Sequence, residues 1–184
     1  DKAVGYAQQM VAAGASIIDV GGESARPGAV VVSSQVQIAR VVPVIDKLRC
    51  VIAADIRISI DARDPEVAAR ALQAGASIIN DISGGQNQEM LDLAATTDAA
   101  IILMHMQGSP ETMQQIPHYV DVVAEIIEFL SRQAAKAVSA GVPPDKVVVD
   151  PGIGFGKSRQ HNLQLLRRLR EIVDLGYPVM LGTS

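Results

Sequence analysis

The sequence predicts an α/β fold and, within that class, a (β/α)8 barrel. Three observations predict it: short apolar runs rich in β-branched residues recur along the chain, helical patterns separate them, and polar residues follow several of them. Because most runs are nearly continuous rather than alternating, they are typical of strands buried on both faces of a parallel sheet. The six runs are Ser16–Val20, Ile56–Ile60, Ser77–Ile82, Ala99–Met104, Val147–Val149 and Pro178–Leu181.

Apolar residues at helical spacing fill the gaps between the runs. Asp64-Pro65-Glu66 predicts a helix start, with an acidic cap and a proline in the first turn. Pro43 should kink the second helix, and Asn162 can cap the last one. The expected helices cover residues 1–13, 34–50, 65–74, 89–95, 120–140 and 162–175.

One hexapeptide occurs twice in the chain. Residues Ala13–Ile18 and Ala74–Ile79 both read Ala-Gly-Ala-Ser-Ile-Ile. Each copy would contain a helix end, a glycine turn and the first half of a strand, which is the junction of a repeated β/α unit. Strands that alternate with helices imply βαβ crossovers and a parallel sheet.

Polar residues recur at one place, at or just past the C-terminal end of an apolar run. In a (β/α)8 barrel that edge is the active-site face, and in an open doubly wound sheet ligands also bind there. Since several different strands contribute polar ends, the pattern favours the barrel. These residues are Asp19, Asp61, Asn80, Asp81, His105 and Asp150.

Length predicts how much of a barrel the chain contains. A (β/α)8 barrel takes about 250 residues and rarely fewer than about 200, whereas this chain has 184. It enters a helix directly at Asp1 and stops just after a run at Ser184. We expect one barrel domain over residues 1–184, incomplete at both ends, with about six of eight strands present and the first and last missing.

Composition predicts the compartment and excludes some partners. The chain has 16 Lys and Arg against 20 Asp and Glu, a net charge of −4 that argues against nucleic-acid binding. No apolar stretch approaches the roughly 18–20 residues that span a bilayer, and no signal-peptide pattern is visible. The single Cys50 excludes an internal disulfide framework and fits a reducing compartment. We expect a cytoplasmic protein without nucleic-acid or membrane partners.

A glycine-rich segment, Gly21–Gly28, follows the first run. Its glycines allow close backbone approach to a ligand, Ser24 offers a hydroxyl, and Arg26 offers a planar fork for phosphate. The alternative is a solvated loop with a surface arginine, and the segment alone does not decide between the two.

Acidic and amide side chains end three runs, at Asp61, at Asn80-Asp81 and at Asp150. A carboxylate together with an asparagine can match the donor and acceptor edge of a planar heterocycle. Three carboxylates could instead hold Mg²⁺, or each could cap the following helix. For any one aspartate the capping role is the more common, but caps need not converge on one edge as this set does.

Two further segments follow strand ends. Gly152–Lys157 has the spacing of neither a dinucleotide fingerprint nor a Walker A loop, so it is a weak phosphate motif. Phe155 within it could flank a ligand or tuck under its own loop. Met104 can pack against a flat ring, whereas His105, between apolar neighbours, is expected to be a hydrogen-bonded structural residue.

Five of these segments, in this order and spacing, resemble the motifs of dihydropteroate synthases along essentially the whole chain. The segments are 17–28, 58–61, 78–82, 103–108 and 149–157. The resemblance implies a (β/α)8 barrel transferase of folate biosynthesis. Such an enzyme condenses 6-hydroxymethyl-7,8-dihydropterin pyrophosphate with p-aminobenzoate, releases pyrophosphate, uses Mg²⁺ and is inhibited by sulfonamides. The resemblance also suggests a homodimer.

The resemblance also implies roles for individual residues. Asp61, Asn80 and Asp150 would hold the pterin edge, Met104 would line the pterin pocket, and Arg26 would contact the pyrophosphate. Of these, Arg26, Asp61 and Asp150 would be the catalytic residues. The p-aminobenzoate pocket would be bordered by Ser24, Ala25, Pro27, Gly154, Phe155 and Ser184.

The chain departs from the family pattern at two alanines. Ala25 and Ala62 stand where the family usually has threonine, and the loss of the first hydroxyl could weaken contacts to p-aminobenzoate. No metal ligand is expected within the chain, because the family's asparagine that helps hold the metal would precede Asp1.

Two alternatives stay open at this point. One is a pterin-binding barrel of the methyltetrahydrofolate methyltransferase type, against which the 24–28 loop and the Phe155 loop argue. The other is a non-catalytic fragment, in which the full-length parent is the enzyme and the 184 residues alone are inactive and do not fold stably.

Overall fold

The computed structural model describes residues 2–26, 28–110, 112–113 and 117–183. Five of the six predicted runs form strands of one parallel sheet, with ends that differ from the prediction by at most one residue. The strands are β1 (Ile17–Gly21), β2 (Arg57–Asp61), β3 (Ile78–Asp81), β4 (Ala100–Met104) and β5 (Val147–Asp150).

All the predicted helices are present, although several have different ends. The N-cap of the third helix is Asp64, whose side chain accepts a hydrogen bond from Glu66 N, as the acidic cap predicted. The helices are α1 (Lys2–Ala12), α2 (Ser34–Val51), α3 (Pro65–Gln73), α4 (Gln88–Thr97), α5 (Val122–Ser139), α6 (Arg159–Arg167) and α7 (Leu169–Val173), with a 3-10 turn η1 (Pro144–Lys146).

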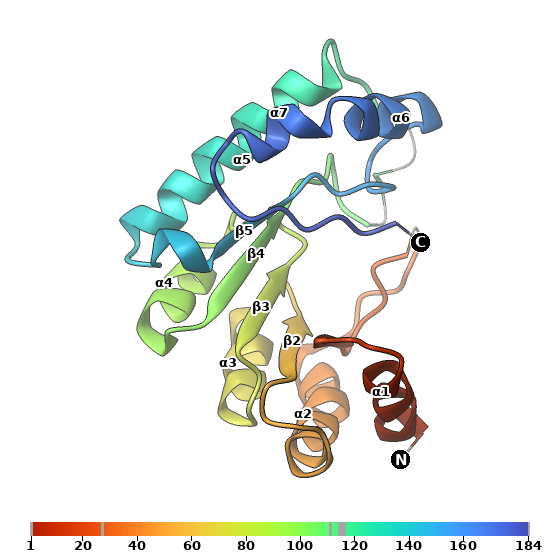
Figure 1. Cartoon of the computed structure of the whole chain (residues 1–184), viewed down its shortest axis with the longest axis vertical. Coiled ribbons are helices and arrows are strands. Elements are labelled where there is room, and N and C mark those ends of the chain that lie inside the picture. Colours follow the sequence, from red (N-terminus) through yellow and green to blue (C-terminus); the bar gives the residue numbers. More distant parts are fainter. Residues whose placement is uncertain (1, 27, 111, 114–116, 184) are drawn as a thin grey trace.

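The order of strands in the sheet is β1-β2-β3-β4-β5, the order in which they occur along the chain. Each crossover therefore advances in the same direction and places its helix on the same side of the sheet. Figure 1 shows the helices arrayed along one side of the curved sheet, with the other side open. An open doubly wound sheet would carry helices on both faces, so the arrangement is that of a (β/α)8 barrel, as predicted.

The hydrophobic core lies between the sheet and its helices. Alternate strand residues on the helix side pair across the sheet register, for example Ile60 with Ile79 and Ile79 with Ile101. All three are fully buried in one apolar cluster with side chains from the helices. Ile78 and Ile102, on the opposite face, are buried but lie outside that cluster. Because successive side chains point to opposite faces of a strand, the sheet has an outer face that packs against the helices and an inner face on the other side.

The two copies of the repeated hexapeptide form the same turn. Gly14 and Gly75 have φ of 102° and 113°, a left-handed conformation that favours glycine. In each copy the amide after the glycine donates to a carbonyl five residues earlier, from Ala15 N to Met10 O and from Ala76 N to the corresponding carbonyl, both at 3.0 Å. Repetition of the sequence therefore reflects repetition of a helix-to-strand junction.

Two sequence-based expectations are wrong in detail. The sixth run, Pro178–Leu181, forms an isolated parallel bridge between Val149 and Val179 rather than a strand. Pro178 has no amide donor, and within the described part of the chain this run makes only two backbone hydrogen bonds to β5, both with Val149. The last helix begins after Ser158, which accepts a hydrogen bond from His161 N, and not at Asn162. It also breaks at Arg168 into α6 and α7.

Helix α2 runs without interruption through Pro43. Among the residues that the structure describes, no helix combines the length and the apolar character needed to cross a membrane.

Candidate active site on the inner face of the sheet

The sheet register brings most of the predicted site residues to one face and one edge. Asp61 pairs with Asn80 across β2 and β3, and Met104 pairs with Asp150 across β4 and β5. Since residues that pair in register point to the same side, and Asp61 directly follows an outward-facing isoleucine, this face is the inner one. The C-terminal edge of the inner face therefore carries carboxylate, amide and thioether side chains together.

Asp81, one of the predicted strand-end residues, lies on the other face of the sheet. It pairs with Leu103, whose side chain belongs to the outer core, so Asp81 points to the helix side. Its carboxylate accepts hydrogen bonds from Ser83 N, Ser83 Oγ and Gly85 N at 2.6–2.8 Å. Asp81 thus stabilises the turn after β3 and is not a site residue.

Asn80 presents an acceptor without a donor. Its Nδ2 donates to Asp19 Oδ2 at 3.2 Å, which orients the amide. Asn80 is 8% exposed, and its Oδ1 is buried with no hydrogen-bond partner among the described residues. An unsatisfied buried acceptor is costly, so this oxygen is suited to a ligand that brings an N–H donor.

The neighbouring Asp61 carboxylate is half-buried and is a second candidate acceptor for the same ligand. Among the described residues no hydrogen bond to its carboxylate is found within the sheet edge or the loops beside it. Burial and, to a smaller extent, the nearby Asp19 carboxylate raise the pKa of Asp61 to about 7, against the opposing effect of Arg63. A donor-bearing ligand at this position would favour the ionised carboxylate and supply the missing hydrogen bonds.

Asp150 and Met104 form the adjoining part of the same edge. Both are 3% exposed, and Asp150 Oδ1 accepts a hydrogen bond from Gly152 N at 2.7 Å. Burial raises the pKa of Asp150 to about 6, partly offset by that hydrogen bond and by the charge of Lys157. The other carboxylate oxygen of Asp150 remains for a ligand. The neighbouring Met104 side chain provides an apolar surface beside it.

The segment after β1 lies beside Asp61. Ser24 and Ala25 line a small pocket together with Asp61, Ala62 and Arg63. Both alanines that depart from the family pattern therefore border the same pocket. Arg26, also in this segment, is exposed, and Pro27 lies outside the described residues.

Glu23 holds this segment in place. Its Oε1 accepts from Val32 N at 2.7 Å, which joins the two ends of the loop, and its Oε2 accepts from Arg63 Nη2 at 2.7 Å. The Glu23 side chain is 14% exposed, so the ion pair is partly shielded from solvent. The loop that carries Ser24 is thereby fixed to the loop that follows Asp61.

Substitution Glu23→Gln is expected to destabilise the protein by about 1 kcal/mol, because the amide keeps one acceptor for Val32 N but loses the charge-assisted bond to Arg63. Urea unfolding measures the change. Glu128→Gln is the matched control, since its ion pair with Arg132 is exposed and 3.8 Å long, and should change stability by less than about 0.5 kcal/mol. Equal effects of the two substitutions would contradict the assigned role of Glu23.

The loop after β5 carries Gly154 and Phe155. Gly154 N donates to Asn162 Oδ1 at 3.0 Å, and Phe155 N donates to Gly152 O at 3.0 Å. Asn162, which was expected to cap a helix, instead holds this loop. Neither Gly154 nor Phe155 borders the pocket that contains Ser24, and Ser184 lies outside the described residues.

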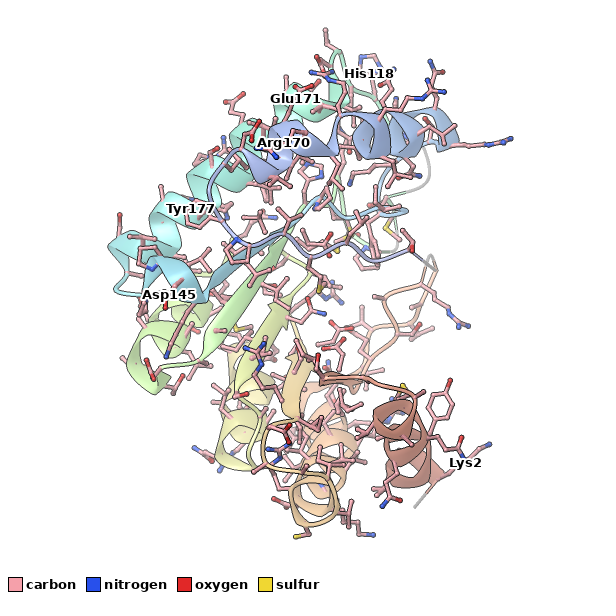
Figure 2. The ribbon with its side chains drawn as sticks, viewed as in Figure 1. Lys2, His118, Asp145, Arg170, Glu171 and Tyr177 are labelled. Atoms are coloured by element: carbon pink, nitrogen blue, oxygen red, sulfur yellow. The ribbon has the colours of Figure 1, made fainter. Side chains whose placement is uncertain are left out.

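The histidines do not contribute to the site. His105 is 7% exposed, lies against Phe129 and accepts from Lys157, which confirms its expected structural role. Figure 2 shows His118 near the start of α5 at the periphery of the molecule. His161 caps α6.

Sequence reasoning gave no role to four residues that shape the site. Asp19 was noted only as a strand end, Glu23 and Lys157 lay unassigned inside motifs, and Arg63 was not singled out. One signal could have identified Asp19: it lies two residues before Gly21, which pairs with Asp61, so its side chain is on the same inner face as that of Asp61. Within the described part of the chain, no group of three or more His, Cys, Asp or Glu residues lies close enough to hold a metal ion.

Comparison with known proteins identifies the family. The family described as pterin binding enzyme matches residues 1–184, the whole chain. The chain belongs to the pterin-binding enzyme family. Among curated members, dihydropteroate synthase of Synechocystis sp. is 47% identical over 183 residues, which cover 99% of this chain and 63% of that protein.

Solved structures of the family have the same fold. Dihydropteroate synthase of Thermus thermophilus in complex with 4-aminobenzoate matches with a TM-score of 0.91 and 47% identity, over 99% of this chain and 68% of the other. The Yersinia pestis dihydropteroate synthase with a sulfonamide drug matches with a TM-score of 0.94 and 41% identity, over 98% and 65%. The T. thermophilus enzyme has also been solved with 6HMPPP. The chain spans somewhat less than two thirds of the length of the curated relatives it matches.

Proposed function

We propose that the full-length protein is a dihydropteroate synthase that condenses 6-hydroxymethyl-7,8-dihydropterin pyrophosphate with p-aminobenzoate. One observation carries the proposal: Asn80 Oδ1 is a buried acceptor without a partner among the described residues, and the half-buried Asp61 carboxylate lies next to it. A pterin ring presents an amino group and a ring N–H on one edge, which are the donors that this pair lacks. The relative solved with 6HMPPP supports the same substrate.

The chain's own residues would bind and orient the reacting groups. Asp61 and Asn80 hold the pterin edge, and Met104 packs against the ring. The C–O bond to pyrophosphate breaks with both electrons leaving on oxygen, which leaves a cation on the pterin methylene. The electron-rich ring and the carboxylates of Asp61 and Asp150 stabilise that cation, and Arg26 neutralises the departing pyrophosphate. The aniline nitrogen then forms the C–N bond and loses a proton, so no protein nucleophile is required.

The second substrate, p-aminobenzoate, would bind beside the loops that follow β1 and β5. Ser24 and Ala25 border the pocket next to Asp61, and the resemblance adds Pro27, Gly154, Phe155 and Ser184. The relatives solved with 4-aminobenzoate and with a sulfonamide drug support a site for this substrate and for sulfonamide inhibitors.

The remaining parts of the proposal rest on the resemblance and on composition. We propose that the enzyme uses Mg²⁺, and the resemblance places its expected asparagine ligand before Asp1. We also propose that the enzyme is a homodimer, as the resemblance suggests, and that it is cytoplasmic, which the single cysteine, Cys50, modestly supports.

The experiment is an assay of pyrophosphate release by the full-length protein. Release that requires both the pterin pyrophosphate and p-aminobenzoate, and that a sulfonamide reduces competitively, is the expected result. Release that does not depend on p-aminobenzoate would overturn the proposal. Binding of a methylated folate with no release would indicate instead the methyltransferase type of pterin-binding barrel.

A further inference from the structure

Lys157 is a buried cation that the proposed reaction does not use. Its side chain follows β5 in the glycine-rich loop, where a lysine would be expected to reach for solvent or for phosphate. Lys157 is instead only 3% exposed. Burying an ammonium group is costly unless its donors are satisfied, so its partners indicate what it does.

The three donors of the ammonium group each have an acceptor. Lys157 Nζ donates to Phe155 O at 2.8 Å, to His105 O at 3.1 Å and to His105 Nδ1 at 3.1 Å. Since Nδ1 accepts, the ring proton of a neutral His105 must be on Nε2. Burial and the charge of Lys157 lower the pKa of His105 to about 3, so the ring stays neutral and remains an acceptor. Burial lowers the pKa of Lys157 to about 7, and the Asp150 carboxylate opposes this shift by favouring the charged form.

These contacts join the two loops that carry opposite parts of the proposed site. His105 directly follows Met104 at the end of β4, on the pterin side, whereas Phe155 is in the β5 loop that the resemblance assigns to p-aminobenzoate. The loops are also in close backbone contact, with His105 N donating to Asp150 O at 2.9 Å. A Cβ atom on Gly152 would lie 2.1 Å from His105 O. Lys157 therefore occupies the centre of a tightly packed two-loop unit.

We propose that Lys157 is a positioning residue that fixes the Gly154–Phe155 backbone relative to the end of β4. Its hydrogen bonds to the Phe155 and His105 carbonyls fix the position of the p-aminobenzoate side of the site relative to the pterin side. The inference rests on the proposed function, because it assigns a substrate to each loop. It predicts that loss of the ammonium group weakens the binding of p-aminobenzoate more than the binding of the pterin.

The test compares Lys157→Met, Lys157→Gln and a matched control in the full-length protein. Methionine has a similar length but no donors, and glutamine keeps two N–H donors with a shorter reach. The control is Lys146→Met, since Lys146 Nζ also donates to a carbonyl, that of Asp98, at 2.9 Å. Lys146 is in η1 at the opposite end of β5, next to Asp145, which Figure 2 labels.

Steady-state kinetics with each substrate varied separately give the readout. For Lys157→Met we expect KM for p-aminobenzoate to rise about tenfold, while KM for the pterin pyrophosphate and kcat change by less than about threefold. Lys157→Gln should lie between this variant and the wild type, and Lys146→Met should match the wild type. Should Lys157→Met fail to fold, Lys157→Gln carries the comparison, with a smaller rise in the same KM.

Several outcomes would overturn the inference. They are an unchanged KM for p-aminobenzoate in both Lys157 variants, an equal loss in both KM values and kcat, and the same change in Lys146→Met. An equal loss would mean that Lys157 stabilises the fold without positioning one substrate. Failure of the proposed function is distinguishable from all of these, because the wild-type protein itself would then show no reaction that depends on p-aminobenzoate.

Discussion

Substitution Asp61→Asn is expected to weaken binding of the pterin pyrophosphate by about a hundredfold while making the protein more stable at pH 8. The carboxylate is the charged acceptor for the pterin donors, and hydrogen bonds to charged groups contribute about 1.5–3 kcal/mol each. Asparagine has nearly the same shape but directs an N–H₂ group at one of those donors. Isothermal titration with the pterin pyrophosphate measures the loss of affinity.

The gain in stability follows from the raised pKa of Asp61. Its folded-state pKa of about 7 lies above its ordinary value of 3.8, so the folded protein holds this proton more tightly than the unfolded chain does. Stability must therefore fall as pH rises from about 4 to about 7, and above pH 7 the whole destabilising effect is present. Asparagine cannot ionise and removes that effect. Each kcal/mol recovered should raise Tm by about 2–4 °C in a chain of this size.

Thermal melts of the wild type and Asp61→Asn at pH 5 and pH 8 test whether the substitution raises stability. The variant should exceed the wild type clearly at pH 8 and much less at pH 5. Asp145→Asn is the control, because Asp145 is exposed in η1 and far from the site. A variant that loses stability at pH 8, or binds the pterin normally, would show that Asp61 is a structural carboxylate.

Substitution Gly152→Ala is expected to abolish activity and to lower stability by more than about 3 kcal/mol. Gly152 has φ of 66°, which costs an L-residue about 1–2 kcal/mol. The added Cβ would also lie 2.1 Å from His105 O, a rigid backbone atom, so the two loops would have to separate. Separation would displace Asp150 and break the hydrogen bond that its carboxylate accepts from Gly152 N.

Gly176→Ala separates the cost of the positive φ from the cost of the Cβ clash. Gly176 has φ of 84° but no atom within 4 Å of the added Cβ, so only the backbone cost applies. Urea unfolding and the pyrophosphate assay should show a loss of about 1 kcal/mol and normal activity for this variant. Equal losses in the two variants would mean that the β4 and β5 loops are not packed as closely as described.

The sequence was sufficient to predict the parallel sheet, because continuous apolar strands and intervening helices are local patterns. It also placed Asp61, Asn80 and Asp150 at strand ends. The resemblance assigned Asn80 to the pterin edge, but the local pattern alone could not separate Asn80 from Asp81, since the two are adjacent and only the register with neighbouring strands decides which one points inward. The outer position of Asp81 follows from tertiary pairing, which no local pattern contains.

Lys157 illustrates a second limit of sequence reasoning. A lysine after three glycines has the composition of a solvated or phosphate-binding loop, and nothing local indicates burial. Its position depends on the loop after β4, about 50 residues earlier in the chain. The sixth run shows the same dependence, since an apolar segment becomes a strand only where a neighbour offers a full ladder of hydrogen bonds, and here it forms a single bridge.

The most direct test of the account is a crystal structure of the full-length protein with the pterin pyrophosphate bound. We predict that the amino group and ring N–H of the pterin lie within hydrogen-bond distance of the Asp61 carboxylate and Asn80 Oδ1, with the ring against Met104. A pterin bound elsewhere, with Asp61 and Asn80 Oδ1 still without donors, would contradict the central claim that these two acceptors form the substrate site.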